Sequence, residues 1–353
     1  MKKATMLLGA ALVTGLSLVL AADSISELAA KAKVEGKIVS YGIPNDWLNY
    51  EKMWKVFTNR YGVTQADTDM SSAEEIAKFL AEKNAPVADV GDVGLAFGPI
   101  GTEQGAFMPY KNSKWAEIPD WAKGADGHYA AAYYGAISFV VNTKLVKNIP
   151  RSWKDLLRPE YKGKIAINDP RRAANAQYAV IAAAMAMGGS ETNIKPGIDY
   201  FAKLQKSGNL IPTVPSLANI QKGEVAIGIN WDYNGLNFRR QLADEGIKLA
   251  IQIPLDGTTV GPYAPVINAF TARPNVAKLF MEFLFSDEGQ RLYAEGGAQP
   301  IRAKIRNSLS AEIRAKMIPA FQYQKVIPIK AWKDMPKIVL GIGEQWATEV
   351  LGQ

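Results

Sequence analysis

Apolar positions in the N-terminal third of the chain change repeatedly from the period of a strand to the period of a helix. Lys37–Tyr41 (KIVSY) has the short apolar pattern of a strand. The helix that follows carries Met53, Phe57 and Tyr61 on one face, and Gly62 is its stop signal. This alternation predicts strand–helix units built around a sheet.

Two further strand–helix units are predicted after this one. Gly62–Thr68 forms the second strand, and Ser72 with Glu75 has the spacing of a capping box. Ala88–Val90 forms the third strand, which ends at residues 91–94. Three successive units imply a parallel, doubly wound sheet whose loops meet at one edge. The candidate ligand-binding residues at this edge are Tyr41, Gly42, Ser71, Ser72, Gly91 and Asp92. The alternative is that the serines only cap a helix and that the aspartate only makes a turn.

The stretch Ser152–Val180 (SWKDLLRPEYKGKIAINDPRRAANAQYAV) predicts a strand–loop–helix unit in the second half of the chain. Its strand is Lys164–Ile167, and its Ala-rich helix is expected to begin with Arg171 and Arg172. Cations in a first helical turn oppose the helix dipole, which favours anions there. Two arginines beside free N–H groups therefore indicate an anionic ligand, with Ala173 and Asn175 beside it. Alternatively, the arginines face solvent or pair with the neighbouring aspartate.

A buried strand, Glu224–Asn230, is followed by Trp231, Asp232 and Tyr233. At the carboxyl end of a strand these side chains can stack on, pair with and hydrogen-bond a small solute. The alternative is that the tryptophan packs the surface between two lobes and the aspartate caps a helix over Gly235–Ala243.

Two apolar segments are predicted to cross between two lobes. Ala130–Asn142 crosses first, and Pro262–Phe270, which contains the candidate ligand residue Tyr263, returns. The mature chain of about 330 residues suits two domains rather than one core. We expect lobe 1 at residues 23–135 and 262–309, and lobe 2 at residues 136–261 and 310–353, with a helical tail on the outside.

The first residues have the pattern of an export signal. Lys2 and Lys3 precede the apolar run Ala4–Ala22, in which Val19 and Ala21 suit the positions that flank a signal-peptidase site. A membrane anchor is the alternative, but glycines and hydroxyl residues dilute the short run. We expect residues 1–22 to be cleaved and the mature protein to diffuse in the periplasm without stable membrane insertion.

Composition argues against several classes of function. With no Cys and one His, the chain lacks a disulfide framework and most zinc or nucleophile–base constellations. No P-loop or GxGxxG stands at a strand–helix turn. The net charge of +7, or +5 without the two signal lysines, is scattered and indicates no nucleic-acid partner. We expect no catalytic residues, no metal and no cofactor, and hence a protein that is not an enzyme.

The stretches SWKDLLRPEYKGKIAINDP, GEVAIGINWDY and VAKLFMEFLFSDEGQRLYAEGG, in this order, resemble the extracellular solute-binding proteins of bacterial ABC importers. The subgroup includes iron(III), polyamine, thiamine, sugar-phosphate and aminoethylphosphonate binders. The resemblance implies the α/β fold of periplasmic binding proteins of type II, with two doubly wound lobes, crossover strands and closure around the solute. It also implies delivery to a membrane permease and ATPase complex. We expect a monomer.

Departures from the family's patterns bear on the ligand. Iron-binding members usually carry adjacent tyrosines where this chain has Trp231-Asp232-Tyr233, which weakens the prediction of ferric iron. Many members have small hydroxyl residues and glycine where this chain has Arg171–Asn175, which favours a phosphate, phosphonate or carboxylate. If an aspartate also lines the cleft, a zwitterion such as an aminophosphonate satisfies both signs. Ferric iron, a polyamine and a sensory role beside a receptor stay as alternatives.

Overall fold

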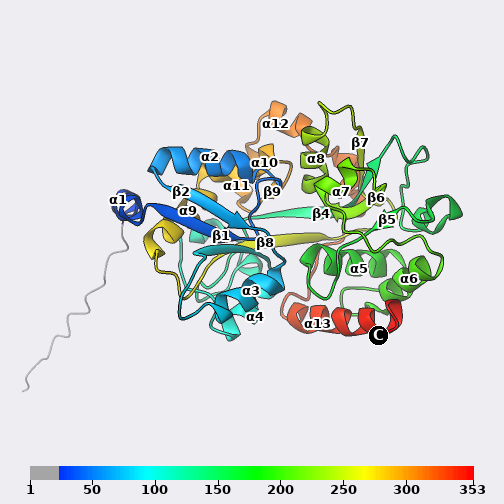
Figure 1. Cartoon of the computed structure of the whole chain (residues 1–353), viewed down its shortest axis with the longest axis horizontal. Helices are drawn as coiled ribbons and strands as arrows, with labels where there is room; N and C mark the ends of the chain where they lie inside the picture. The colour runs from blue at the N-terminus through cyan, green and yellow to red at the C-terminus, as the bar shows by residue number, and fades with distance from the viewer. Residues whose placement is uncertain (1–23) are drawn as a thin grey trace, which may run out of the picture.

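Strands β4 (Tyr133–Asn142) and β8 (Val260–Ile267) run through both halves of the molecule and join two α/β lobes (Figure 1). The computed structural model describes residues 24–353, so the predicted signal peptide lies outside the described residues. Within that range the strands form a nine-stranded sheet of order β2-β1-β3-β8-β4-β6-β5, to which β7 and β9 add by pairing with β4. The predicted α/β architecture with two lobes and crossover strands is confirmed.

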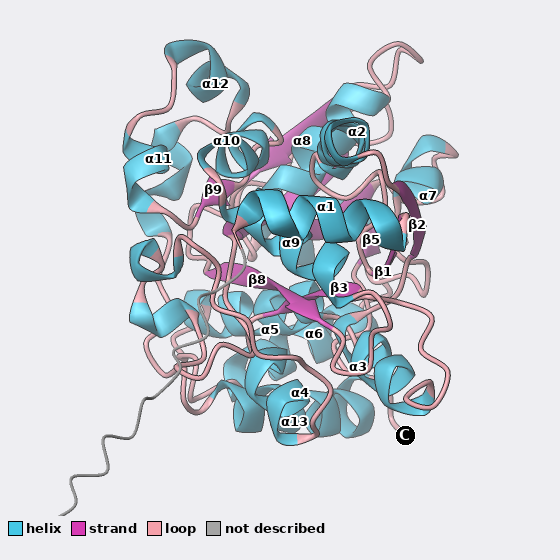
Figure 2. Cartoon of the chain, turned by 90° about the vertical axis from the view of Figure 1, so that its left-hand side faces the viewer, coloured by secondary structure: helices cyan, strands magenta, loops and turns pink. Residues whose placement is uncertain are grey.

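Lobe 1 contains the parallel strands that the N-terminal pattern predicts. β1 (Lys37–Tyr41) pairs in parallel with β2 (Thr64–Thr68) and β3 (Val90–Gly94), whereas β8 returns antiparallel to β3. Two groups of helices cover opposite faces of this sheet (Figure 2). The first group is α1 (Ile25–Glu35), α2 (Tyr50–Tyr61), α9 (Pro274–Phe285) and α10 (Asp287–Glu295), and the second is α3 (Ser72–Ala81) and α4 (Phe97–Glu103).

Lobe 2 is built on the far halves of the crossover strands. Its strands are β5 (Ile165–Ala166), β6 (Ile227–Trp231) and β7 (Leu249–Gln252), and the short β9 (Gln299–Pro300) pairs with β4 on the lobe 1 side. Its helices are α5 (Ala174–Ala186), α6 (Lys195–Lys206), α7 (Leu217–Gln221) and α8 (Asp232–Gln241). Helix α5 is buried almost all round, which explains why its sequence is rich in alanine instead of amphipathic.

The C-terminal tail crosses between the lobes a third time. Its helices are α11 (Ala303–Asn307), α12 (Ala311–Lys316) and α13 (Met335–Gln345), with a 3-10 helix at Ala320–Lys325 and a π-helix at Trp346–Val350. Met317 packs against the small cluster around Leu309 in lobe 1, whereas Ile318 and Val326 pack in lobe 2. Helix α13 then lies along α5, so the tail ends on lobe 2, while α1 lies at the far end of lobe 1 (Figure 1).

Two glycines face each other where the crossover strands pass between the lobes. Gly135 of β4 and Gly261 of β8 are register partners. A Cβ at Gly261 would lie 2.1 Å from the ring of Trp231, and one at Gly135 would lie 2.4 Å from the ring of Tyr233. The glycines therefore leave the space into which the start of α8 packs its aromatic rings.

Several element boundaries differ from prediction, and those around the candidate site have local reasons. β3 extends to Gly94, so Gly91 and Asp92 lie within the strand and not in the loop after it. The capping box is formed by Ser71 and Glu74, because the sequence SSAEE fits the motif in two registers and the second glutamate is buried instead.

Helix α5 begins at Ala174, and the arginines precede it. Asp169 holds the chain in a turn, since its side chain accepts a hydrogen bond from the N–H of Arg171 and its carbonyl accepts from the N–H groups of Arg172 and Ala173. Helix α8, in contrast, begins earlier than predicted, at Asp232.

Candidate functional site

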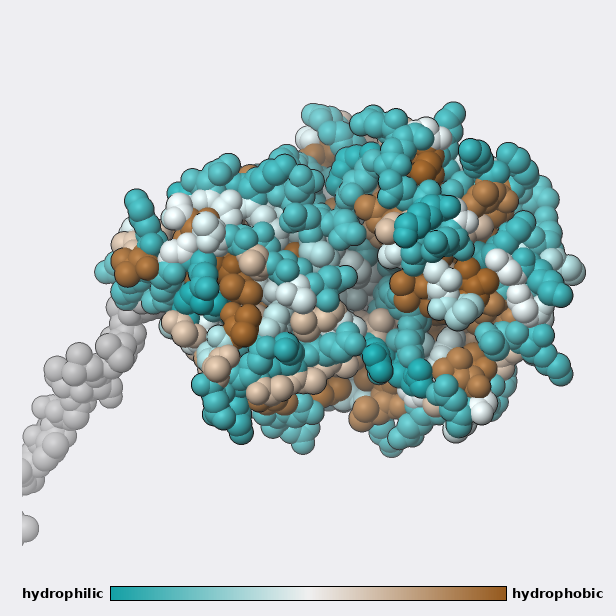
Figure 3. Space-filling model, in the orientation of Figure 1, coloured by the Kyte–Doolittle hydropathy of each residue, from teal (hydrophilic) through white to brown (hydrophobic). Residues whose placement is uncertain are grey.

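A cavity of about 470 Å³ lies between the two lobes, at the carboxyl edge of the lobe 1 strands. On the face shown in Figure 3 the surface is hollowed between the lobes. Lobe 1 lines the cavity with Gly42, Trp47, Asp69, Met70, Ser71, Ser72, Glu74, Glu75, Asp92 and Tyr263. Lobe 2 lines it with Asn168, Asp169, Arg172, Ala173, Ala174, Asn175 and Val214. This size is typical of pockets for small molecules.

The lobe 2 wall is the amino end of α5. The residue at its N-cap is Ala173, which has no side-chain oxygen to accept a hydrogen bond from the first helical turn. The side chain of Asn175 accepts from the N–H of Ala176, and its Nδ2 donates to Asn230 over 3.0 Å. The N–H groups of Ala174 and Asn175 are thus left for a ligand at the positive end of the helix dipole.

The lobe 1 wall includes the amino end of α3. Glu74 accepts hydrogen bonds from the backbone and the hydroxyl of Ser71, and the Ser72 hydroxyl accepts from the N–H of Gly94 over 3.0 Å. Across the cavity, Nη1 of Arg172 lies 3.4 Å from a carboxylate oxygen of Glu74. Two helix amino ends and one arginine therefore face the same cavity from opposite lobes.

The floor of the cavity on the lobe 1 side holds two buried carboxyl groups, Glu75 and Asp92, which we call the acid pair. Only 1% and 2% of these residues are exposed. Oε2 of Glu75 accepts the N–H of Asp92 over 2.8 Å. Burial raises the pKa of Glu75 well above its ordinary value, and the neighbouring Asp92 raises this pKa further.

Asp92 is only partly satisfied by its neighbours. Its Oδ2 accepts hydrogen bonds from the hydroxyls of Tyr133, at 2.6 Å, and Tyr50, at 3.0 Å. Its Oδ1 is buried and has no hydrogen-bond partner among the described residues. Burial raises the pKa of Asp92 to about 7, although the two tyrosine hydroxyls act in the opposite direction.

The predicted ligand residues separate into those at the cavity and those elsewhere. Gly42, Ser71, Ser72, Asp92, Arg172, Ala173, Asn175 and Tyr263 line it. Tyr41 points away, because its hydroxyl donates to Glu82 over 2.7 Å and its ring stacks on Phe79. Arg171 also points away from the cavity, and its Nε and Nη2 donate hydrogen bonds to Asp169. Gly91 makes space for Glu75 from behind the cavity lining.

Trp231, Asp232 and Tyr233 do not line the cavity, contrary to the ligand role predicted from their place after a strand. The two aromatic residues are fully buried under the crossover strands. Oδ1 of Asp232 accepts from the N–H groups of Ala136 and Tyr233, and its Oδ2 accepts from the hydroxyl of Tyr323 over 2.7 Å. Trp231 packs against Tyr178, Tyr233 and Tyr263. Asp232 joins the start of α8 to β4 and to the tail.

Several lining residues were not predicted. The sequence pattern places Glu75 in a capping box, and Trp47, Asp69, Asn168 and Val214 are not among the predicted ligand residues. Asp69 and Asn168 each follow a predicted strand directly, so the strand-end rule that selects their neighbours applies to them as well. No local pattern marks Trp47, which reaches the cavity because Tyr133 accepts its Nε1–H over 2.9 Å.

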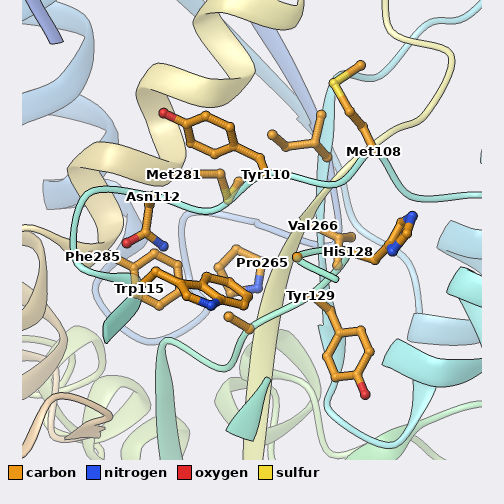
Figure 4. A pocket seen from close by; sticks show the side chains of 13 residues that line it. Met108, Tyr110, Asn112, Trp115, His128, Tyr129, Pro265, Val266, Met281 and Phe285 are labelled. Carbon is orange, nitrogen blue, oxygen red and sulfur yellow. The ribbon is translucent and has the colours of Figure 1, made fainter. Parts of the chain in front are cut away.

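A second cavity, inside lobe 1, has room for about one water molecule. Its volume is about 20 Å³, and Tyr110, Trp115, Tyr129, Met281 and Phe285 are among the side chains around it (Figure 4). This space is too small for an organic solute, whereas the interlobe cavity is large enough for one.

The buried Asp232 predicts a dependence of stability on pH. Burial raises the pKa of Asp232 to about 7, more than the hydrogen bond from Tyr323 lowers it. In the unfolded chain this carboxyl ionises near pH 4. Between about pH 4 and pH 7 the unfolded state therefore binds fewer protons, so stability falls as pH rises and levels off above the folded pKa.

We expect the free energy of unfolding of the wild type, relative to Asp232→Asn, to fall over that interval. Urea unfolding of both proteins at several pH values measures this difference. Because only its slope is used, a constant offset from the amide does not matter. A difference that is the same at every pH would contradict the shifted pKa.

Two α/β lobes joined by strands, with a cavity between helix amino ends, define a protein that holds a small ligand in an interlobe cleft. Residues 85–320 match the family model described as bacterial extracellular solute-binding protein. The chain belongs to this family. Among residues 24–353 we find no helix with the length and apolar character needed to cross a membrane.

Three similar proteins extend the comparison. The chain is 30% identical over 283 residues to an uncharacterized protein of Haemophilus influenzae, covering 75% of this chain and 77% of the relative. It is 25% identical over 271 residues to a putative 2-aminoethylphosphonate-binding periplasmic protein of Salmonella typhimurium, with the same two coverages. The structure of the periplasmic binding protein AfuA from Actinobacillus pleuropneumoniae, with fructose-6-phosphate bound, has a TM-score of 0.71 at 24% identity, covering 90% of this chain and 99% of AfuA.

The chain is thus a periplasmic solute-binding protein, as the resemblance in its sequence implied. Members of this family bind small solutes and work with the permease and ATPase of ABC importers.

Proposed function

We propose that this protein captures a small anionic solute in the interlobe cavity and delivers it, as a monomer, to an ABC permease. The observation that carries the proposal is the amino end of α5, which has Ala173 at its N-cap and Arg172 beside it. Backbone N–H groups, a helix dipole and a guanidinium together favour a phosphate, phosphonate or carboxylate. The solute is bound and released unchanged.

Two of the similar proteins support an anionic ligand. The Salmonella relative is named for 2-aminoethylphosphonate, and the AfuA structure has fructose-6-phosphate bound. Both compounds carry a phosphorus oxyanion. The amino end of α3 on the opposite wall adds a second positive dipole end. Closure of the lobes would bring the two helix ends together around the anion.

A polyamine is a second candidate, because acidic side chains outnumber basic ones around the cavity. Asp69, Glu74, Glu75, Asp92 and Asp169 line it, and so do Trp47 and Tyr263. Carboxylates and aromatic rings are the groups that hold ammonium ions. Against this candidate, Asp169 is already held by Arg171, and Glu74 by Ser71.

Thermal unfolding with a panel of compounds tests the proposal. The panel contains 2-aminoethylphosphonate, fructose-6-phosphate, putrescine and ferric citrate, added to refolded, ligand-free mature protein. A ligand at about 100 times its Kd adds about 2.7 kcal/mol, which raises the melting temperature by several degrees. We expect stabilisation by at least one phosphorus oxyanion. Stabilisation by putrescine or ferric citrate alone would refute the anionic solute.

A further inference from the structure

The acid pair has features that the binding of an anion does not explain. Asp92 is 2% exposed, lines the cavity, and keeps its buried Oδ1 without a partner among the described residues. A buried carboxyl oxygen that lacks a donor is costly. Arg172 is the one arginine or lysine among the described residues that line the cavity, and its partner is Glu74. A ligand in the cavity can supply the missing donor.

Two glycines are needed to hold Glu75 in this place. A Cβ at Gly42 would lie 2.3 Å from Oε1 of Glu75, and a Cβ at Gly91 would lie 2.4 Å from its Oε2. Gly42 has a φ of 67° as well, a conformation that favours glycine. Glycines on both sides thus make room for the carboxyl group of Glu75, although burial disfavours its ionised form. We infer that this carboxyl group serves the ligand and not the stability of the fold.

A primary ammonium group fits these observations. It presents three donors and one positive charge, which would satisfy Oδ1 of Asp92 and complement the acid pair. The rings of Trp47 and Tyr263 also line the cavity, and aromatic faces attract cations. No group of three or more His, Asp or Glu among residues 24–353 is arranged to hold a metal ion, which favours an organic cation.

We propose that Glu75 and Asp92 form a subsite for a primary ammonium group, so that the solute is a zwitterion whose anionic end binds at Arg172 and α5. This inference rests on the anionic site of the proposed function and adds the second charge of the solute. It also explains why a cavity for an anion carries buried carboxyl groups.

Proton release upon binding follows from the environment of the pair. The ionisable groups that face it are Asp67 and Asp69 at the end of β2, Tyr50 on α2, Tyr133 on β4, Tyr233 on α8, Tyr263 on β8 and Tyr293 on α10. None of these is cationic, and burial raises the pKa values of both carboxyls of the pair. An ammonium ion favours the ionised form, so we expect its binding to lower these pKa values and to release protons.

Calorimetric titration with a matched pair of probes tests the subsite. 2-Aminoethylphosphonate and propylphosphonate differ by a methyl group in place of the ammonium. We expect the wild type to bind the amino compound more tightly by roughly tenfold to a hundredfold. Titrations in buffers of different ionisation enthalpy at pH 7 should show net release of protons only for the amino compound.

Three variants distinguish a loss of ammonium binding from a general loss of folding. Glu75→Gln and Asp92→Asn keep the shape of the side chains and should each reduce the preference for the amino compound to about threefold or less. The control is Glu82→Gln, which removes a carboxyl at the end of the same helix outside the cavity and should keep the wild-type preference. Circular dichroism and thermal unfolding confirm that each variant is folded.

The outcomes distinguish this inference from the proposed function. If the wild type binds both phosphonates equally, or binds only fructose-6-phosphate, the ammonium subsite is wrong and the anionic site stands. If putrescine binds and no phosphorus oxyanion does, both are wrong. A preference for the amino compound that survives in Glu75→Gln and Asp92→Asn also overturns the assignment of the acid pair.

Discussion

Arg172→Ala is expected to weaken the binding of an anionic solute by about tenfold or more, whereas Arg171→Ala should leave the affinity within about twofold of the wild type. The two residues are adjacent in the sequence but differ in their surroundings. Arg172 lines the cavity, its side chain is 65% exposed, and its partner Glu74 is 3.4 Å away. It can therefore turn to a ligand at little cost.

Arg171 is committed elsewhere. It binds both carboxylate oxygens of Asp169, and its Nη1 donates to Gln353 over 2.7 Å. Calorimetric titration of both variants with the phosphorus oxyanion that stabilises the wild type measures the contrast. Equal losses in the two variants would mean that both arginines hold the solute. Unchanged affinity in Arg172→Ala would show that this guanidinium does not bind the solute.

Gly261→Ala is expected to destabilise the protein by about 3 kcal/mol and to lower its melting temperature by several degrees. The new Cβ would lie 2.1 Å from Cη2 of Trp231, whose ring is fully buried. That ring cannot shift freely, because it also contacts Tyr178, Tyr233 and Tyr263. The clash must therefore distort the crossover strand or the start of α8.

Gly341→Ala is the matched control for this prediction. Gly341 lies inside α13, and nothing lies within 4 Å of an added Cβ. We expect this variant to be as stable as the wild type or more stable by up to about 1 kcal/mol, since alanine favours a helix. Thermal and urea unfolding of the two variants give the comparison. Equal stability of Gly261→Ala and the wild type would show that the crossover strands accommodate the added methyl group without strain.

The sequence predicts the site best where topology alone determines position. Gly42, Ser71 and Ser72 follow parallel strands, and the carboxyl ends of such strands meet at one edge whatever the details of packing. The same rule finds Asp92, although the strand is longer than expected and the residue lies inside it. Fold class and lobe crossing follow similarly from the order of strands and helices.

The rule fails where side-chain direction decides. Trp231 ends β6, one residue later than the predicted strand, and α8 starts immediately afterwards and turns its first residues under the crossover strands. Tyr41 ends β1, yet its side chain lies on the face that packs against Phe79. A position at the end of a strand does not specify which way a side chain points, because neighbouring elements supply the partners.

Glu75 shows a different limit. Its sequence context, SSAEE, supports two helix registers, and in either of them one glutamate caps the helix while the other is free for another use. The glycines that make room for it, Gly42 and Gly91, lie 33 and 16 residues away in the chain. Only the packing of β1, β3 and α3 reveals that these three positions form one arrangement.

The tail's third crossing leaves the two ends of the described chain in different lobes. The amino end of α1 lies at the outer end of lobe 1, and the side chain of the last residue, Gln353, accepts a hydrogen bond from Arg171 of lobe 2. A hinge motion that brings the lobes together moves one of these ends relative to the other. The two ends are therefore natural attachment points for a donor and an acceptor fluorophore. Resonance energy transfer between these labels would report solute binding, and no label would have to be inserted into either lobe.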